Sequence, residues 1–159
     1  MIVIINLFNE VVIMNNRILV WLALIIAPTA LVFSAIDQDG FIRLQPDEME
    51  WHEQADSPAS YVYLAGDSNE EGFYMIRAKF PPGVMSRPHY HTTDRHVTVI
   101  SGTWYTGTGS EFDTDNMIAI EPGGYMMHPA GEMHYDGSKG AEDVIVEIKG
   151  VGPNTTVRF

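Results

Sequence analysis

Short stretches of β-branched and aromatic residues recur along the chain after residue 59, and glycine or proline separates most of them. Stretches of this length and composition are typical of β-strands. The pattern predicts an all-β sandwich or barrel, with one helix near residues 46–53, where Asp47 and Glu48 suit a first turn. The predicted strands span residues 60–65, 72–80, 96–100, 103–106, 117–120, 125–128 and 144–148.

The first part of the chain has a different pattern. Residues 18–33 are apolar except at Pro28 and Thr29, and the small residues Ser34 and Ala35 follow. A positively charged start, an apolar run and small residues are the order found in a secretory signal peptide. The alternative is a membrane anchor, but a run of about 16 residues is short for a span, which needs roughly 20.

We therefore predict that residues 1–35 form a signal peptide and that translation starts at Met14, just before the charged Arg17. Residues 36–159 then form one domain, which would be periplasmic or secreted. No stable membrane span is expected after cleavage of the signal.

Charge and cysteine content narrow the function. The chain has 159 residues with 21 acidic and 9 basic side chains, a net charge of −12 that argues against a nucleic-acid partner. There is no cysteine, which excludes disulfides, cysteine-ligated zinc, iron–sulfur clusters and thiol nucleophiles. Of the 6 histidines, all but His52 fall between His89 and His134.

Three of these histidines are candidate metal ligands. His89 and His91 are separated by one residue, so on a strand both side chains project from the same face. His134 follows a Pro-x-Gly turn, and a barrel can bring it opposite the first pair. We predict that the three imidazoles hold one divalent ion.

The spacing around the first pair resembles the first motif of the cupin superfamily. Gly83 is followed after five residues by His89 and His91, and Gly102 closes the motif at residues 83–102. The position of the glutamate ligand in this motif is occupied by Arg95. Arginine has no lone pair to give to a metal ion, so it cannot replace that ligand.

The second half, residues 123–138, resembles the second cupin motif. Gly123, the Pro129-Ala130-Gly131 turn and His134 fall on its spacing, and Ser138 takes the place of the final asparagine. We expect this last substitution to affect a turn more than the chemistry.

The resemblance covers about residues 72–148, and the chain is similar to a group of small single-domain bacterial cupins. It implies a cupin jelly-roll β-barrel, or double-stranded β-helix, with a metal inside. The ion could be iron, zinc, manganese or nickel. A homodimer is compatible with the resemblance, since small cupins often pair through barrel edges.

Without the glutamate, the double positive charge of the ion favours an anionic ligand such as hydroxide or a substrate carboxylate or enolate. Arg95 would add a positive contact to that anion, or would turn outward to pair with Asp94 or another carboxylate. A fourth protein ligand could come from His96 or His128. If Arg95 faces the interior, however, strand alternation turns His96 outward.

We predict an exported metal-dependent enzyme that acts on a small anionic or enolisable molecule, with Arg95 and His128 as catalytic candidates. A dioxygenase-type reaction is favoured, because a three-histidine cupin resembles oxygenases that cleave diketones, thiols or flavonols. The alternative is a non-catalytic module that binds metal and ligand for sensing or storage, as zinc-binding cupin domains in anti-sigma factors do. Metal-free sugar isomerisation is less compatible with converging histidines.

Overall fold

The computed structural model of the protein describes residues 39–158, and the predicted signal peptide lies outside them. In this part of the chain the regular elements are strands and one short 3-10 helix, which confirms the all-β prediction. No helix among the described residues is long and apolar enough to cross a membrane. The elements are η1 (Pro46–Glu48), β1 (His52–Gln54), β2 (Ser57–Ala65), β3 (Gly72–Phe80), β4 (His89–His91), β5 (Arg95–Ser101), β6 (Trp104–Thr108), β7 (Ile118–Ile120), β8 (Tyr125–His128), β9 (His134–Gly137), β10 (Val144–Gly152) and β11 (Thr156–Arg158).

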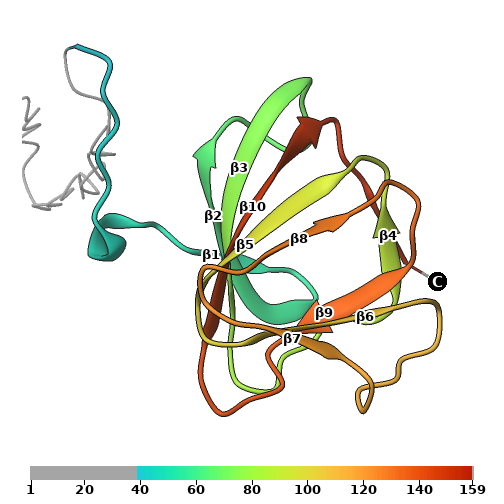
Figure 1. Ribbon diagram of the computed structural model, residues 1–159. Coiled ribbons are helices and arrows are strands. Elements are labelled where there is room, and N and C mark those ends of the chain that lie inside the picture. The colour runs from blue at the N-terminus through green and yellow to red at the C-terminus, as the bar shows by residue number, and fades with distance from the viewer. Residues whose placement is uncertain (1–38, 159) are drawn as a thin grey trace, which may run out of the picture. The chain divides into compact units, whose positions relative to one another are not determined.

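The strands form two antiparallel sheets that face each other, as Figure 1 shows. The larger sheet has 6 strands in the order β1-β2-β3-β10-β5-β8, and the smaller has 5 in the order β11-β4-β9-β6-β7. Strands distant in sequence are neighbours in both sheets, so segments far apart in the chain come together in the interior.

Each of the seven predicted strands is present, and four short strands were not among them: β1, β4, β9 and β11. The predicted helix is reduced to η1, where the Gln45 amide donates to Glu48 Oε2 at 2.7 Å. The helix stops there because the chain next forms β1, which pairs with β2. Tertiary pairing therefore overrides the local preference of residues 49–53.

Two motif glycines occupy backbone conformations that other residues rarely adopt. Gly83 has φ 73° in the turn before β4, and Gly102 has φ 69° in the turn between β5 and β6. A Cβ at Gly102 would also lie 2.6 Å from the Asp143 carbonyl oxygen. The turn geometry explains why glycine is required at these two places.

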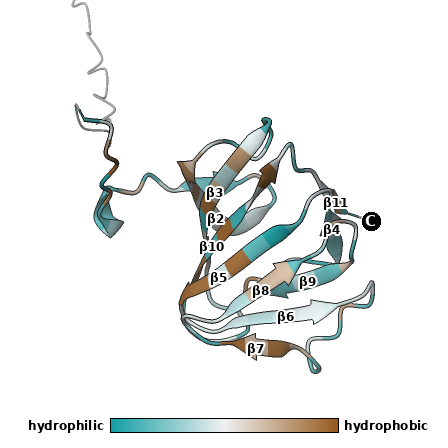
Figure 2. Ribbon diagram, turned by 45° about the horizontal axis from the view of Figure 1, so that its top comes forward, coloured by the Kyte–Doolittle hydropathy of each residue, from teal (hydrophilic) through white to brown (hydrophobic). Residues whose placement is uncertain are grey.

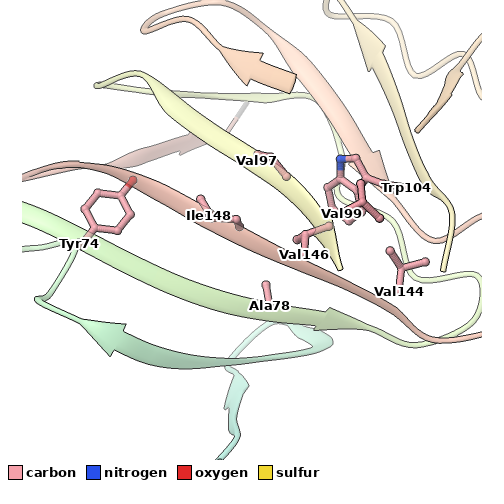
Figure 3. Close-up of a cluster of buried hydrophobic side chains, with 8 residues drawn as sticks. All are labelled: Tyr74, Ala78, Val97, Val99, Trp104, Val144, Val146 and Ile148. Atoms are coloured by element: carbon pink, nitrogen blue, oxygen red, sulfur yellow. The ribbon is translucent and has the colours of Figure 1, made fainter. Parts of the chain in front are cut away.

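The apolar core lies between the two sheets (Figure 3). Most of its side chains come from β3, β5 and β10, while Trp104 reaches in from β6 of the opposite sheet. The ring of Trp104 is 2% exposed and packs edge-to-face on Phe80, with ring centroids 4.8 Å apart. The core consists of Tyr74, Ala78, Val97, Val99, Trp104, Val144, Val146 and Ile148.

Replacing Trp104 by alanine is expected to lower the free energy of unfolding by about 3–5 kcal/mol, because it leaves a cavity between the sheets. Urea unfolding followed by circular dichroism measures this change. The control is Ile118→Ala on β7, where the side chain is 68% exposed and the expected change is within about 0.5 kcal/mol. Equal losses for the two variants would contradict the assignment of the core.

The interior of the barrel is polar at one end and apolar at the other. On β5 the inward positions are Arg95, Val97 and Val99, and Figure 2 shows this strand hydrophilic at its start and hydrophobic toward its end. Arg95 pairs with Gly150 on one side and with His128 on the other. One end of the barrel is thus filled by the apolar core, and the other end collects polar and ionisable side chains.

Candidate metal centre

Strand β4 supplies two of the predicted ligands. His89 and His91 lie on the same face of this strand, and both are buried. Their Nε2 atoms are 3.2 Å apart. The alternation of side chains on a strand therefore produces the pairing that the one-residue spacing predicts.

Strand β9 brings the third predicted ligand beside them. His134 is the register partner of His89, and its ring centroid lies 4.4 Å from that of His89 and 5.2 Å from that of His91. One ring nitrogen from each histidine lies within 4.8 Å of the others. The structure brings the three residues together, and their binding of a metal stays a prediction.

The hydrogen bonds of these rings fit a metal site. Nδ1 of His89 lies 2.7 Å from the Arg87 carbonyl oxygen, and Nδ1 of His134 lies 2.9 Å from the Glu132 carbonyl oxygen. A carbonyl only accepts hydrogen bonds, so each Nδ1 carries a proton, and in the neutral tautomer with this proton Nε2 is the nitrogen with the lone pair. Backbone carbonyls orient metal-binding histidines in the same way. His134 Nε2 is buried and has no hydrogen-bond partner among the described residues.

His128 lies directly against this group. Its ring stacks on that of His134, with centroids 3.6 Å apart and an angle of 13° between the planes. The side chain is buried, and neither ring nitrogen has a hydrogen-bond partner in the described part of the chain. The structure therefore places His128 beside the three predicted ligands, where the sequence analysis allowed a fourth ligand.

A carboxylate that sequence reasoning missed also faces these rings. Asp136 is 6% exposed, and its Oδ2 lies 3.4 Å from His128 Nε2 and 4.0 Å from His134 Nε2. The signal was present in the sequence, because Asp136 stands two residues after His134 on the same strand face. His128, His134 and Asp136 form a second group of potential ligands that shares His134 with the first.

Arg95 points inward. Its Nη1 contacts Nε2 of His91 and lies 3.3 Å from Nδ1 of the same ring. Asp94, the predicted outward partner, instead accepts a hydrogen bond from the Ala130 amide at 2.8 Å. Of the two orientations that the sequence left open, the structure shows the one that directs the guanidinium toward the histidines.

His96 and Ser138 lie away from the cluster. His96 is exposed, and its Nδ1 lies 2.8 Å from the hydroxyl oxygen of Tyr125, so alternation on β5 excludes it as a ligand. The buried Ser138 donates to the Glu142 carbonyl oxygen at 3.0 Å. It holds a turn, as expected for the residue that replaces the motif asparagine.

The surroundings keep three of the imidazoles neutral. Burial is the largest cause that lowers the pKa of His89, His91 and His128, and the pKa of His128 falls to about 3. The Arg95 guanidinium lowers the pKa of His91 further, whereas Asp136 opposes the shift at His89 and His128. Neutral imidazole is the form that binds a metal ion.

The metal-free protein is expected to lose stability as the pH falls below about 6.5, where histidines of the unfolded chain become protonated. The buried rings stay neutral in the folded state, so protons bind the unfolded chain preferentially. Each such ring removes up to about 1.4 kcal/mol of unfolding free energy per pH unit until its folded pKa is reached. Thermal unfolding of chelator-treated protein from about pH 7.5 to about pH 5 measures this slope. His128→Asn should show a shallower slope, and a flat wild-type profile would contradict the prediction.

Two facing antiparallel sheets with converging histidines at one end define a cupin. A family profile described as "ChrR Cupin-like domain" matches residues 39–150, and the chain belongs to that family. No curated protein matches the sequence.

Solved structures share the fold at low identity. The polyketide cyclase RemF from Streptomyces resistomycificus is 15% identical, with a TM-score of 0.60 over 75% of this chain and 87% of that chain. A cupin-superfamily sugar phosphate isomerase from Silicibacter pomeroyi is 19% identical, with a TM-score of 0.59 over 74% and 81%. KdgF from a Halomonas species is 18% identical, with a TM-score of 0.53 over 68% and 91%. At these identities the similarity shows the fold.

Proposed function

We propose that this protein is a metal-dependent enzyme that acts on a small anionic or enolisable organic molecule. One observation carries the proposal. His89, His91 and His134 converge inside the barrel, and the backbone carbonyls that bind Nδ1 of His89 and His134 leave Nε2 of both rings directed toward the other histidines. Three imidazoles suit a divalent transition metal.

The residues beside the ligands fit an anionic substrate. The Arg95 guanidinium points into the histidine cluster, and once it withdraws from Nε2 of His91 it can bind a carboxylate or enolate oxygen beside the ion. His128 is buried and neutral beside the ligands, so one of its ring nitrogens can orient the substrate by a hydrogen bond. A bound metal would polarise an oxygen of the substrate, and iron would in addition permit reaction with O₂.

For the reaction itself, we propose a dioxygenase-type oxidation of a diketone, thiol or phenolic compound, in which both atoms of O₂ enter the products. The three-histidine set and the adjacent cation support this choice. Two structural neighbours are described as a polyketide cyclase and a sugar phosphate isomerase, so small organic molecules are substrates of this fold.

Elemental analysis of the natively purified protein, followed by oxygen uptake across a panel of diketones, thiols and phenolics, tests the proposal. We expect bound iron and oxygen consumption with at least one compound class, and loss of that activity in Arg95→Ala. Substrate conversion without oxygen uptake would indicate a proton-transfer reaction, for which His128 and Asp136 lie in reach of each other. Tightly held zinc without turnover would indicate the non-catalytic binding module instead.

We also propose that the protein is exported, on the basis of the apolar run at residues 18–33 and the small residues that follow it. N-terminal sequencing of the protein from its native cells tests this. We expect the mature chain to begin near residue 36, and an intact Met1 would contradict export by cleavage.

A further inference from the structure

We propose that Asp136 supplies the anionic metal ligand that the first cupin motif lacks in this chain. The inference rests on the proposed metal site. The glutamate position of the motif carries Arg95, whose guanidinium cannot bind a cation. The carboxylate would thus come from β9, on the opposite sheet, rather than from β5.

The distances from Asp136 to His134 and His128 suit an ion that the carboxylate shares with these two rings. Two atoms that each bond to one ion at about 2.1 Å lie no more than about 4.2 Å apart. Asp136 Oδ2 lies 4.0 Å from His134 Nε2 and 3.4 Å from His128 Nε2, and the Nε2 atoms of His89 and His91 are 3.2 Å apart. His134 belongs to both ligand groups, so an ion on its Nε2 is within reach of the carboxylate.

The carboxylate is held in place by Ser86, outside the cluster. The Ser86 hydroxyl donates to Asp136 Oδ1 at 2.6 Å, and the Ser86 amide donates to the Asp136 carbonyl oxygen at 2.7 Å. The Asp136 amide in turn donates to the Ser86 hydroxyl oxygen at 3.0 Å. These bonds fix Oδ1 and direct Oδ2 toward the rings, as hydrogen bonds to metal-binding carboxylates do.

The burial of the group points to the same role. Asp136 and His128 are 6% and 5% exposed, yet neither ring nitrogen of His128 makes a hydrogen bond to this carboxylate or to any other described residue. Buried charges in proteins are paired or bind metals. A divalent ion between Oδ2 and the imidazoles would satisfy the carboxylate and reduce the uncompensated charge that three neutral ligands would leave.

Metal titration of the full chain, freed of metal by a chelator, tests the proposal with Zn²⁺ as the probe. We expect Asp136→Asn to weaken zinc binding by about 100-fold or more, and Ser86→Ala to weaken it by roughly 10-fold, because Ser86 only positions the ligand. Asp94→Asn is the matched control, since this carboxylate bonds to a backbone amide and should leave affinity unchanged. Circular dichroism of each variant checks that it folds.

The outcomes separate this inference from the proposed function. If His89→Ala abolishes zinc binding while Asp136→Asn and Ser86→Ala bind as tightly as wild type, the Asp136 assignment is overturned and the metal site stands. If wild type binds no zinc, both fail. Should Asp136→Asn fail to fold, a crystal structure of the zinc-loaded wild type decides: we expect Oδ2 within about 2.2 Å of the ion, and an ion without this contact would overturn the proposal.

Discussion

Replacing His134 by alanine is expected to weaken metal binding roughly 100- to 1000-fold, more than the loss of His128. A four-ligand zinc site contributes approximately 10–16 kcal/mol, which is about 3 kcal/mol for each ligand. His134 is the ring that both groups of potential ligands share, and its Nε2 has no hydrogen-bond partner among the described residues. Its removal therefore leaves neither group complete.

Competition with a chromophoric chelator measures the affinity of the variant. His96→Ala is the matched control, because His96 is an exposed histidine whose partner is the hydroxyl of Tyr125. Wild type and the control should also gain thermal stability when metal is added, by about 2.7 kcal/mol at a free metal concentration 100 times the Kd. A His134→Ala protein that binds metal like the control would place the ion elsewhere.

The fold was predictable where side-chain alternation extends over several residues. Strands such as β3 and β10 carry long runs of β-branched and aromatic residues, because one face of each strand packs in the core. The missed strands β1, β4, β9 and β11 have three or four residues each and contain polar side chains. Their pairing depends on neighbours distant in sequence, and local composition does not record this.

In the candidate site, too, some residues could be predicted from local spacing, and others depend on how distant strands are arranged. His89, His91 and His134 were predictable because motif spacing fixes their strand faces. The stacking of His128 on His134 depends on how β8 and β9, which lie in different sheets, face each other. The inward direction of Arg95 follows from alternation on β5, but its contact with His91 requires the position of β4. Asp136 was missed because the cupin motif has no ligand at that position.

Replacing Arg95 by glutamate is expected to strengthen metal binding by about 100-fold, since it removes a positive charge near the ion and adds a negative one. The guanidinium contacts Nε2 of His91, so binding of a cation at that nitrogen requires Arg95 to withdraw. Removing this positive charge eliminates its repulsion with the metal ion. Glutamate also introduces a carboxylate at the position where the cupin motif has its ligand. Arg95→Gln removes the charge without adding a ligand and should give roughly a 10-fold gain.

The cost of Arg95→Glu is expected in the metal-free protein. The introduced carboxylate would lie in the same interior as that of Asp136, and two buried like charges without a cation destabilise the fold. The metal-free variant should therefore unfold at a lower temperature than wild type, and the metal-loaded variant should not. Chelator competition and thermal unfolding with and without Zn²⁺ measure both effects. If Arg95→Gln binds metal more weakly than wild type, the guanidinium supports the ligand geometry instead of opposing the ion, and this prediction is wrong.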